Sequence, residues 1–168
     1  LTYRFRPMPK FPENWCHPVA AAAALLLLVA CSSAETRLRE HLQLADKYYE
    51  QADYQKARLE YQNALKIDEK NADAHYRLGK TMEQLQDVRS VVANYGRAVE
   101  LDPKHVDARV HLAYVYLAVK AKDEAKRLDD EGLALNPEHP ELIALRGNIR
   151  LMEGDTAGAL ADGEAALA

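Results

Sequence analysis

The sequence of 168 residues predicts an all-α fold, a solenoid of repeated helix–turn–helix units that follows an N-terminal export segment. Two observations after residue 37 predict the solenoid. Small and apolar residues recur at intervals of 34 residues, and the apolar residues within each interval have helical rather than strand spacing. A third observation, a short apolar run that ends at a cysteine, predicts the export segment.

Residues 1–30 have the features of a secretory signal. Three basic side chains within the first ten residues precede an apolar run from Val19 to Ala30. A helix of about 12 residues spans about 18 Å, which is short of the roughly 30 Å hydrocarbon core of a membrane. We therefore expect this segment to be cleaved rather than to cross the membrane.

The end of the apolar run, Leu28-Val29-Ala30-Cys31, resembles the lipobox of bacterial lipoproteins. The resemblance implies that Cys31 is acylated through its sulfur, becomes the first residue of the mature chain and anchors it to a membrane. In that family an aspartate after the cysteine often marks retention at the inner membrane, so Ser32 favours the outer membrane, with the chain facing the periplasm. Two alternatives stay open, an ordinary signal peptide followed by a chance cysteine and a true membrane anchor.

The composition of the mature part excludes some classes of protein. Removal of residues 1–30 takes away three of the 22 basic and one of the 26 acidic residues, which leaves a net charge of −6. An acidic domain is a poor nucleic-acid binder, because affinity for nucleic acid comes mainly from neutralised phosphates. The two cysteines are Cys16, in the discarded segment, and Cys31. No disulfide is therefore available, and packing must supply the stability.

Internal repetition with a period of 34 residues is the main signal after residue 37. The positions that keep this period are Ala57, Val91, Ala125 and Ala159; Ala64, Ala98, Gly132 and Ala166; Leu44, Leu78 and Leu112; and Ile67, Leu101 and Leu135. We interpret each repeat unit as two helices, A and B, joined by a short turn such as "QADYQ" at residues 51–55. Asp102-Pro103 and Asn136-Pro137 end the second helices of units two and three.

This arrangement resembles the tetratricopeptide repeat, a helix–turn–helix unit of 34 residues, across residues 38–168. The resemblance implies a right-handed α-solenoid of about four units after a lead-in of residues 31–37. The units are residues 38–71, 72–105, 106–139 and 140–168, the last incomplete. Small residues stand where the two helices of the family nearly touch, namely Ala45, Gly79, Ala113 and Gly147 in helix A and Ala57, Ala64, Ala98, Ala125, Ala159 and Ala166 in helix B. We also expect Tyr48 and Tyr116 to pack against adjacent units.

Several positions depart from the family's pattern. Asp129 and Gly163 replace an aromatic residue, and His41 and His75 replace a tryptophan. We expect the acidic pair Asp129-Asp130 to lie on solvated helix surface. Because no polar capping helix follows unit four, we expect the chain to be the N-terminal portion of a longer repeat protein. The alternative is a complete four-unit chain whose open face is covered by a partner or by a dimer mate.

No constellation of residues indicates catalysis, a cofactor or a metal. Four of the six histidines recur with the repeat, and none has spacing that would bring three ligands together. Neither a serine before a Gly-rich turn nor a phosphate-binding loop occurs. We therefore expect no enzymatic activity, no cofactor and no metal site within these residues.

The remaining candidate surface is helix A, which lines the concave face in the tetratricopeptide family. The resemblance implies a partner groove formed by Tyr49, Tyr76, Arg77, Lys80, His111, Tyr114 and Asn148. We expect an extended peptide or a helix of a partner to contact the tyrosines while Arg77 and Lys80 donate hydrogen bonds, with Tyr114 approaching from the next unit. Substitution of Tyr76 and Arg77 together is expected to remove binding without loss of stability, with Glu60 on helix B as the control position. The alternative is that the tyrosines only pack against the adjacent unit.

These features together predict a lipid-anchored periplasmic scaffold for protein–protein interaction in an envelope export or assembly system. The lipobox, the lead-in "SSAETRLREHL" and the first unit "YYEQADYQKARLEYQNALKID" resemble the tetratricopeptide lipoproteins of exopolysaccharide export and PEP-CTERM protein sorting. Two alternatives stay open. One is an outer-membrane or pilus assembly lipoprotein of the same fold, and the other is the docking arm of an enzyme whose catalytic domain follows residue 168.

Overall fold

The computed structural model describes the backbone of residues 16–167 and the side chains of residues 33–167. The first half of the predicted signal and the side chain of Cys31 lie outside this range, so acylation of Cys31 stays a prediction. The chain divides into two compact parts, Leu1–Thr36 and Arg37–Ala168. Helix α1, Cys16–Glu50, begins in the first part and ends in the second. Among the described residues, no helix is long and apolar enough to cross a membrane.

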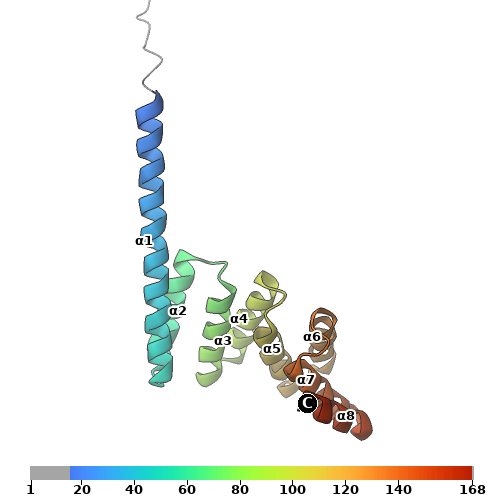
Figure 1. Ribbon diagram of the computed structural model, residues 1–168. Coiled ribbons are helices and arrows are strands. Elements are labelled where there is room, and N and C mark those ends of the chain that lie inside the picture. The colour runs from blue at the N-terminus through green and yellow to red at the C-terminus, as the bar shows by residue number, and fades with distance from the viewer. Residues whose placement is uncertain (1–15, 168) are drawn as a thin grey trace, which may run out of the picture. The chain divides into compact units, whose positions relative to one another are not determined.

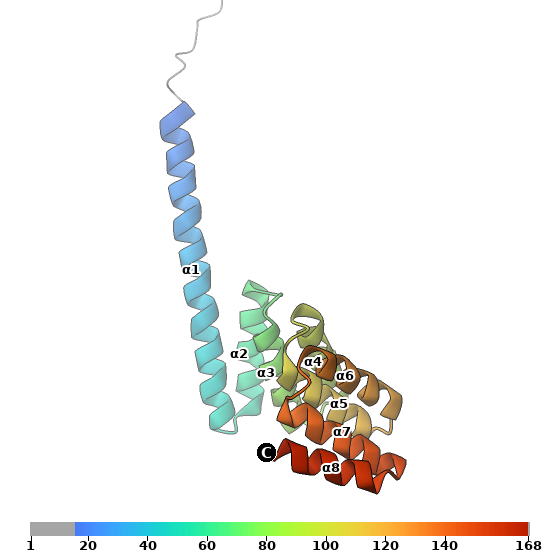
Figure 2. The ribbon, with the colours of Figure 1, turned by 45° about the vertical axis from the view of Figure 1, so that its right-hand side comes forward.

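All regular structure in residues 16–167 is helical, which confirms the predicted all-α class (Figure 1). After α1 come α2 (Tyr54–Ile67), α3 (Ala72–Gln84), α4 (Val88–Leu101), α5 (Val106–Ala118), α6 (Lys122–Leu135), α7 (Pro140–Glu153) and α8 (Thr156–Ala166). From α2 onward each helix packs against the next, and α5 also packs against α7. In Figure 2 the last pair, α7 and α8, lies side by side. This pattern of contacts between neighbours is that of a solenoid.

The turn between helix A and helix B has the same geometry in all four units. One residue in each turn has a positive φ, and the next residue donates its N–H to a carbonyl oxygen five residues earlier, as Asp87 does to Met82 at 3.0 Å. The residues with positive φ are Ala52 (57°), Gln86 (58°), Lys120 (63°) and Gly154 (86°). Only the glycine adopts this conformation without a steric cost. The predicted turn at residues 51–55 is confirmed.

Small residues allow the close approach of the helices, as the repeat predicts. Ala57 and Ala125 are completely buried. A Cβ atom placed on Gly79 would lie 2.6 Å from two ring atoms of Tyr95, so this position of α3 accepts no larger residue without movement. Ala159 and Ala166 in α8 are only half-buried, because α8 packs on α7 and on no later helix among the described residues.

Asp129 corrects the expectation that the pair Asp129-Asp130 is solvated. Asp130 is exposed, but only 1% of Asp129 is accessible to solvent. The repeat register places Asp129 on the inner face of α6, where Tyr61 and Tyr95 are the buried aromatic residues of units one and two. The position of Asp129 in the helical repeat therefore determines its burial, although a charged side chain is usually found on the surface.

Glu60 corrects a second expectation, because it is not a free polar residue. Its Oε2 lies 2.6 Å from Nδ1 of His41, and the pair joins the helices of unit one. Unit two repeats this contact between His75 and Asn94, whose Nδ1 and Oδ1 atoms lie 3.2 Å apart. Glu60 is therefore unsuitable as a neutral control.

Tyr48 and Tyr116 are partly buried and pack against the core, while their packing against adjacent units stays a prediction.

Candidate partner-binding groove

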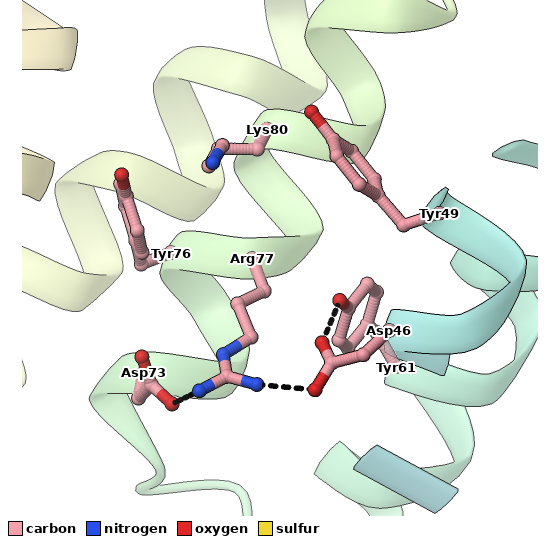
Figure 3. A pocket seen from close by; sticks show the side chains of 7 residues that line it. All are labelled: Asp46, Tyr49, Tyr61, Asp73, Tyr76, Arg77 and Lys80. Carbon is pink, nitrogen blue, oxygen red and sulfur yellow. Dashed lines mark hydrogen bonds and ion pairs between the residues drawn. The ribbon is translucent and has the colours of Figure 1, made fainter. Parts of the chain in front are cut away.

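Four of the seven predicted groove residues surround one hollow on the helix-A side of units one and two (Figure 3). Its volume is about 260 Å³, and Lys80 of α3 lies between Tyr49 and Tyr76, two of the three tyrosines that line it. The Lys80 Nζ is 5.6 Å from the centre of the Tyr49 ring and 5.7 Å from that of the Tyr76 ring. Within the described part of the chain, Lys80 has no carboxylate at ion-pair distance. Its ammonium is therefore held by cation–π attraction and can still donate hydrogen bonds to a ligand.

Arg77 has a different role from the one expected of it. Its guanidinium donates from Nη1 to Asp46 Oδ2 at 2.5 Å and pairs through Nη2 with Asp73 Oδ2 at 2.7 Å. The other oxygen of Asp46 accepts from the hydroxyl of the buried Tyr61, also at 2.5 Å. The chain Tyr61–Asp46–Arg77–Asp73 thus joins unit one to unit two (Figure 3). Substitution of Arg77 would remove this connection between the units, so we now expect Arg77→Ala to change stability as well as the groove.

Tyr76 connects the hollow to unit three through its ring. The Tyr76 ring centre lies 4.8 Å from that of His105, 5.7 Å from that of His111 and 5.8 Å from that of Tyr95. Burial, and then the nearby acids, among them Asp107, raise the pKa of Tyr76 to about 12. Its hydroxyl therefore stays protonated at neutral pH and can donate a hydrogen bond to a partner.

Two of the three remaining groove residues, His111 and Tyr114, line a second hollow at units three and four. It has a volume of about 280 Å³ and is lined by Val110, His111, Tyr114, Glu141 and Ala144. Asn148 donates from Nδ2 to the hydroxyl of Tyr114 at 3.0 Å, and Tyr114 is 40% exposed. We expected Tyr114 to approach Tyr76 and Lys80, but the structure places it in this second hollow. The seven residues thus divide into two groups, which the ring contact between Tyr76 and His111 connects.

Sequence reasoning missed three residues of the first hollow, Asp46, Tyr61 and Asp73. The i,i+4 spacing of Asp73 and Arg77 on one helix could have revealed their ion pair. No local pattern signals the bond between Arg77 and Asp46, which are 31 residues apart. Among the residues that the structure describes, no cluster of three or more histidine, cysteine or acidic side chains is placed to hold a metal ion.

The repeated helix pairs and the aromatic surface along helix A define the class of the protein, a helical-repeat protein. Two sequence models, described as "TPR repeat" and "Tetratricopeptide repeat", match residues 45–86 and 86–149. The chain belongs to the tetratricopeptide repeat family. Proteins of this family are typically non-catalytic scaffolds, and the fold is suited to binding protein partners in its groove.

Solved structures with the same fold include several bacterial proteins. MamA has a TM-score of 0.69 at 20% identity, with 77% of this chain and 76% of that chain covered. A thermophilic tetratricopeptide protein of Thermus thermophilus has a TM-score of 0.66 at 22% identity, with 77% and 73% covered. The pilF protein of Pseudomonas aeruginosa has a TM-score of 0.70 at 21% identity, with 80% of this chain but only 62% of pilF covered. No curated protein matches the sequence significantly.

Proposed function

We propose that this chain is a lipid-anchored scaffold on the periplasmic side of a bacterial envelope, where it holds protein partners of an export or assembly system. The observation that carries the binding role is the position of Lys80 between Tyr49 and Tyr76. Two aromatic rings supply apolar contact area, and an ammonium without a carboxylate partner among the described residues supplies donors. Such a combination is suited to a partner segment that presents an acidic or carbonyl oxygen beside an apolar side chain.

The anchoring role rests on the lipobox ending at Cys31 and is tested separately. In cells labelled with a fatty acid, the wild-type protein should carry the label and fractionate with the membrane. Cys31→Ser should lose the label and be unprocessed or released, because the acceptor sulfur is absent. Equal fatty-acid labelling of the two proteins would contradict the lipoprotein assignment.

The binding role is tested by capture of partners from solubilised envelopes. Lys80→Glu should reduce recovery of the partner strongly, because it removes the cation and adds a negative charge to the groove. Loss of an interface residue of this kind costs about 2 kcal/mol or more, roughly thirtyfold in affinity. Gln62→Glu makes a charge change at an exposed position of α2 and should leave recovery unchanged. Equal recovery by both variants would place the binding site elsewhere.

Within this role, we propose a system of the exopolysaccharide or PEP-CTERM type, because the lead-in and the first unit resemble its lipoproteins. A second candidate is a lipoprotein of pilus or outer-membrane assembly, because a lipobox followed by tetratricopeptide repeats fits that class equally. Identification by mass spectrometry of the partner that Lys80→Glu loses separates the two. A component of exopolysaccharide export favours the first, and a pilus or outer-membrane component favours the second.

A further inference from the structure

A third hollow, which is mainly apolar, opens between units two and three, near the turns between helices A and B. Its volume is about 490 Å³, within the range of roughly 300–1,000 Å³ typical of ligand pockets. Valine side chains of α4 and α5 line it, and Val88 and Val119 at its rim are 51% and 53% exposed. Glu83, at the end of α3, is the one charged residue of its lining.

The equivalent place between units one and two shows what fills such a hollow. Tyr49 and Tyr54 stand one repeat before Glu83 and Val88. Their ring centres lie 5.4 Å apart in an edge-to-face arrangement. Two aromatic rings therefore occupy the place that is open one repeat later.

The equivalent place between units three and four is bridged in a different way. Leu117 and Lys122 stand one repeat after Glu83 and Val88. The Lys122 Nζ lies 3.5 Å from Glu153 Oε1, so the start of α6 is joined to the end of α7. The junction of units one and two is therefore filled by two tyrosine rings, and the junction of units three and four is bridged by an ion pair. Only the junction of units two and three, among these three described junctions, has the hollow.

Residue differences explain the opening. Valine at position 88 lacks the ring that Tyr54 provides, and Glu83 carries a charge where Tyr49 carries a ring. Glu83 Oε1 lies 3.6 Å from His111 Nδ1, but His111 is positively charged only when protonated. A negative rim beside an apolar hollow therefore favours a ligand that is both aromatic and cationic.

We propose that this hollow binds an aromatic side chain of a protein partner, whose neighbouring lysine or arginine pairs with Glu83. The inference rests on the proposed function as a protein-binding scaffold and adds a second contact point to it. The aromatic ring would occupy the hollow as Tyr54 occupies the preceding place. The adjoining cation would form an ion pair with Glu83, which has no permanently charged partner among the residues that the structure describes.

The test uses valine-methyl NMR of the full chain in detergent micelles, titrated with blocked dipeptide amides. Phe-Lys should give saturable shifts at Val88, Val91, Val115 and Val119. Phe-Glu should bind about two- to fivefold more weakly, as expected for loss of an exposed ion pair. Ala-Lys should bind far more weakly than either, because it has no ring. Absence of saturable shifts with Phe-Lys, or equal binding of all three peptides, would overturn the inference.

Substitutions separate the hollow from the rest of the protein. Val88→Tyr restores the aromatic residue of unit one and should block Phe-Lys binding by filling the hollow. Arg89→Tyr places a tyrosine at the exposed neighbouring position instead, and it should leave binding unchanged. Val119→Lys is a second variant, for use if Val88→Tyr does not fold. It adds a positive charge at an exposed rim position and should weaken Phe-Lys binding. Binding that persists in a folded Val88→Tyr protein, or that Arg89→Tyr abolishes equally, would contradict the assignment.

The same variants distinguish this inference from the proposed function. Envelope capture that depends on Lys80 while Phe-Lys fails to bind would refute the hollow and leave the scaffold intact. Capture that is insensitive to Lys80→Glu while Phe-Lys binds would refute the groove and keep the hollow.

Discussion

Replacement of Asp129 by asparagine should change how the stability of the repeat domain depends on pH. Asp129 is buried at the junction of units three and four, and its Oδ1 has no hydrogen-bond partner among the described residues. Burial is the main cause that raises the pKa of its carboxyl from 3.8 to about 7. The charge of Asp130 adds to this effect, whereas Arg146 and Arg150 oppose it.

The sign of the effect follows from the raised pKa. Between about pH 4 and pH 7 the unfolded chain has released this proton and the folded chain still holds it, so stability falls as the pH rises. The slope is at most about 1.4 kcal/mol for each pH unit, which amounts to at most about 2–3 kcal/mol between pH 5 and pH 7. Asp162 acts in the opposite direction, because its bonds to Arg146 lower its pKa. Its contribution is lost only as the pH falls below about 4.

Urea denaturation of the purified protein, followed by far-UV circular dichroism at pH 5, 6, 7 and 8, measures the effect. Asp129→Asn should gain stability relative to the wild type as the pH rises from 5 to 7, by at most about 2–3 kcal/mol. Asp123→Asn is the control, because it removes a carboxylate at an exposed position of the same helix, and it should follow the wild-type profile. Parallel profiles for the wild type and Asp129→Asn would refute the placement of a protonated carboxyl between units three and four.

Two further predictions concern the close contacts between helices, and the same denaturation assay checks both. Gly79→Ala should cost about 1–3 kcal/mol, because the new Cβ would lie 2.6 Å from the ring of Tyr95. Gly96→Ala, which meets nothing within 4 Å, should instead gain up to about 1 kcal/mol from helix propensity, and equal effects at the two glycines would contradict this packing. Ala57→Leu should cost about 1–3 kcal/mol at a fully buried contact, whereas Gln62→Leu on the exposed side of the same helix should stay within about 0.5 kcal/mol. A similar cost at both positions would mean that the repeat register is wrong.

The repeat register was predictable because it depends on periodic small residues. A 34-residue period is visible in the sequence, and the burial of Ala57 and Ala125 follows from it directly. The turn at residues 51–55 was predictable for the same reason. The shared left-handed conformation was not, because in three of the four turns a non-glycine residue adopts it.

The polar contacts were not predictable, because their partners are far apart in the sequence. Arg77 and Asp46 are 31 residues apart, and His41 and Glu60 are 19 apart. Each residue alone has the chemical type of a solvated surface position. Asp129 shows the same difficulty, because only the register, and not its charge, indicates that it is buried. Periodicity therefore predicts which small residues are buried, whereas ion pairs across units decide which polar side chains of helix A are already paired.

Site-specific photo-crosslinking in intact cells tests the binding role of the groove most directly. A photoreactive phenylalanine analogue would replace Tyr76, which lines the hollow beside Lys80, and in a second protein Gln62, which is exposed on α2. Tyr76 should give a discrete crosslinked product with an envelope protein, and Lys80→Glu should remove that product. Gln62 should give no such product. Crosslinking from Gln62 but not from Tyr76, or a Tyr76 product that Lys80→Glu leaves unchanged, would contradict a partner site in this groove.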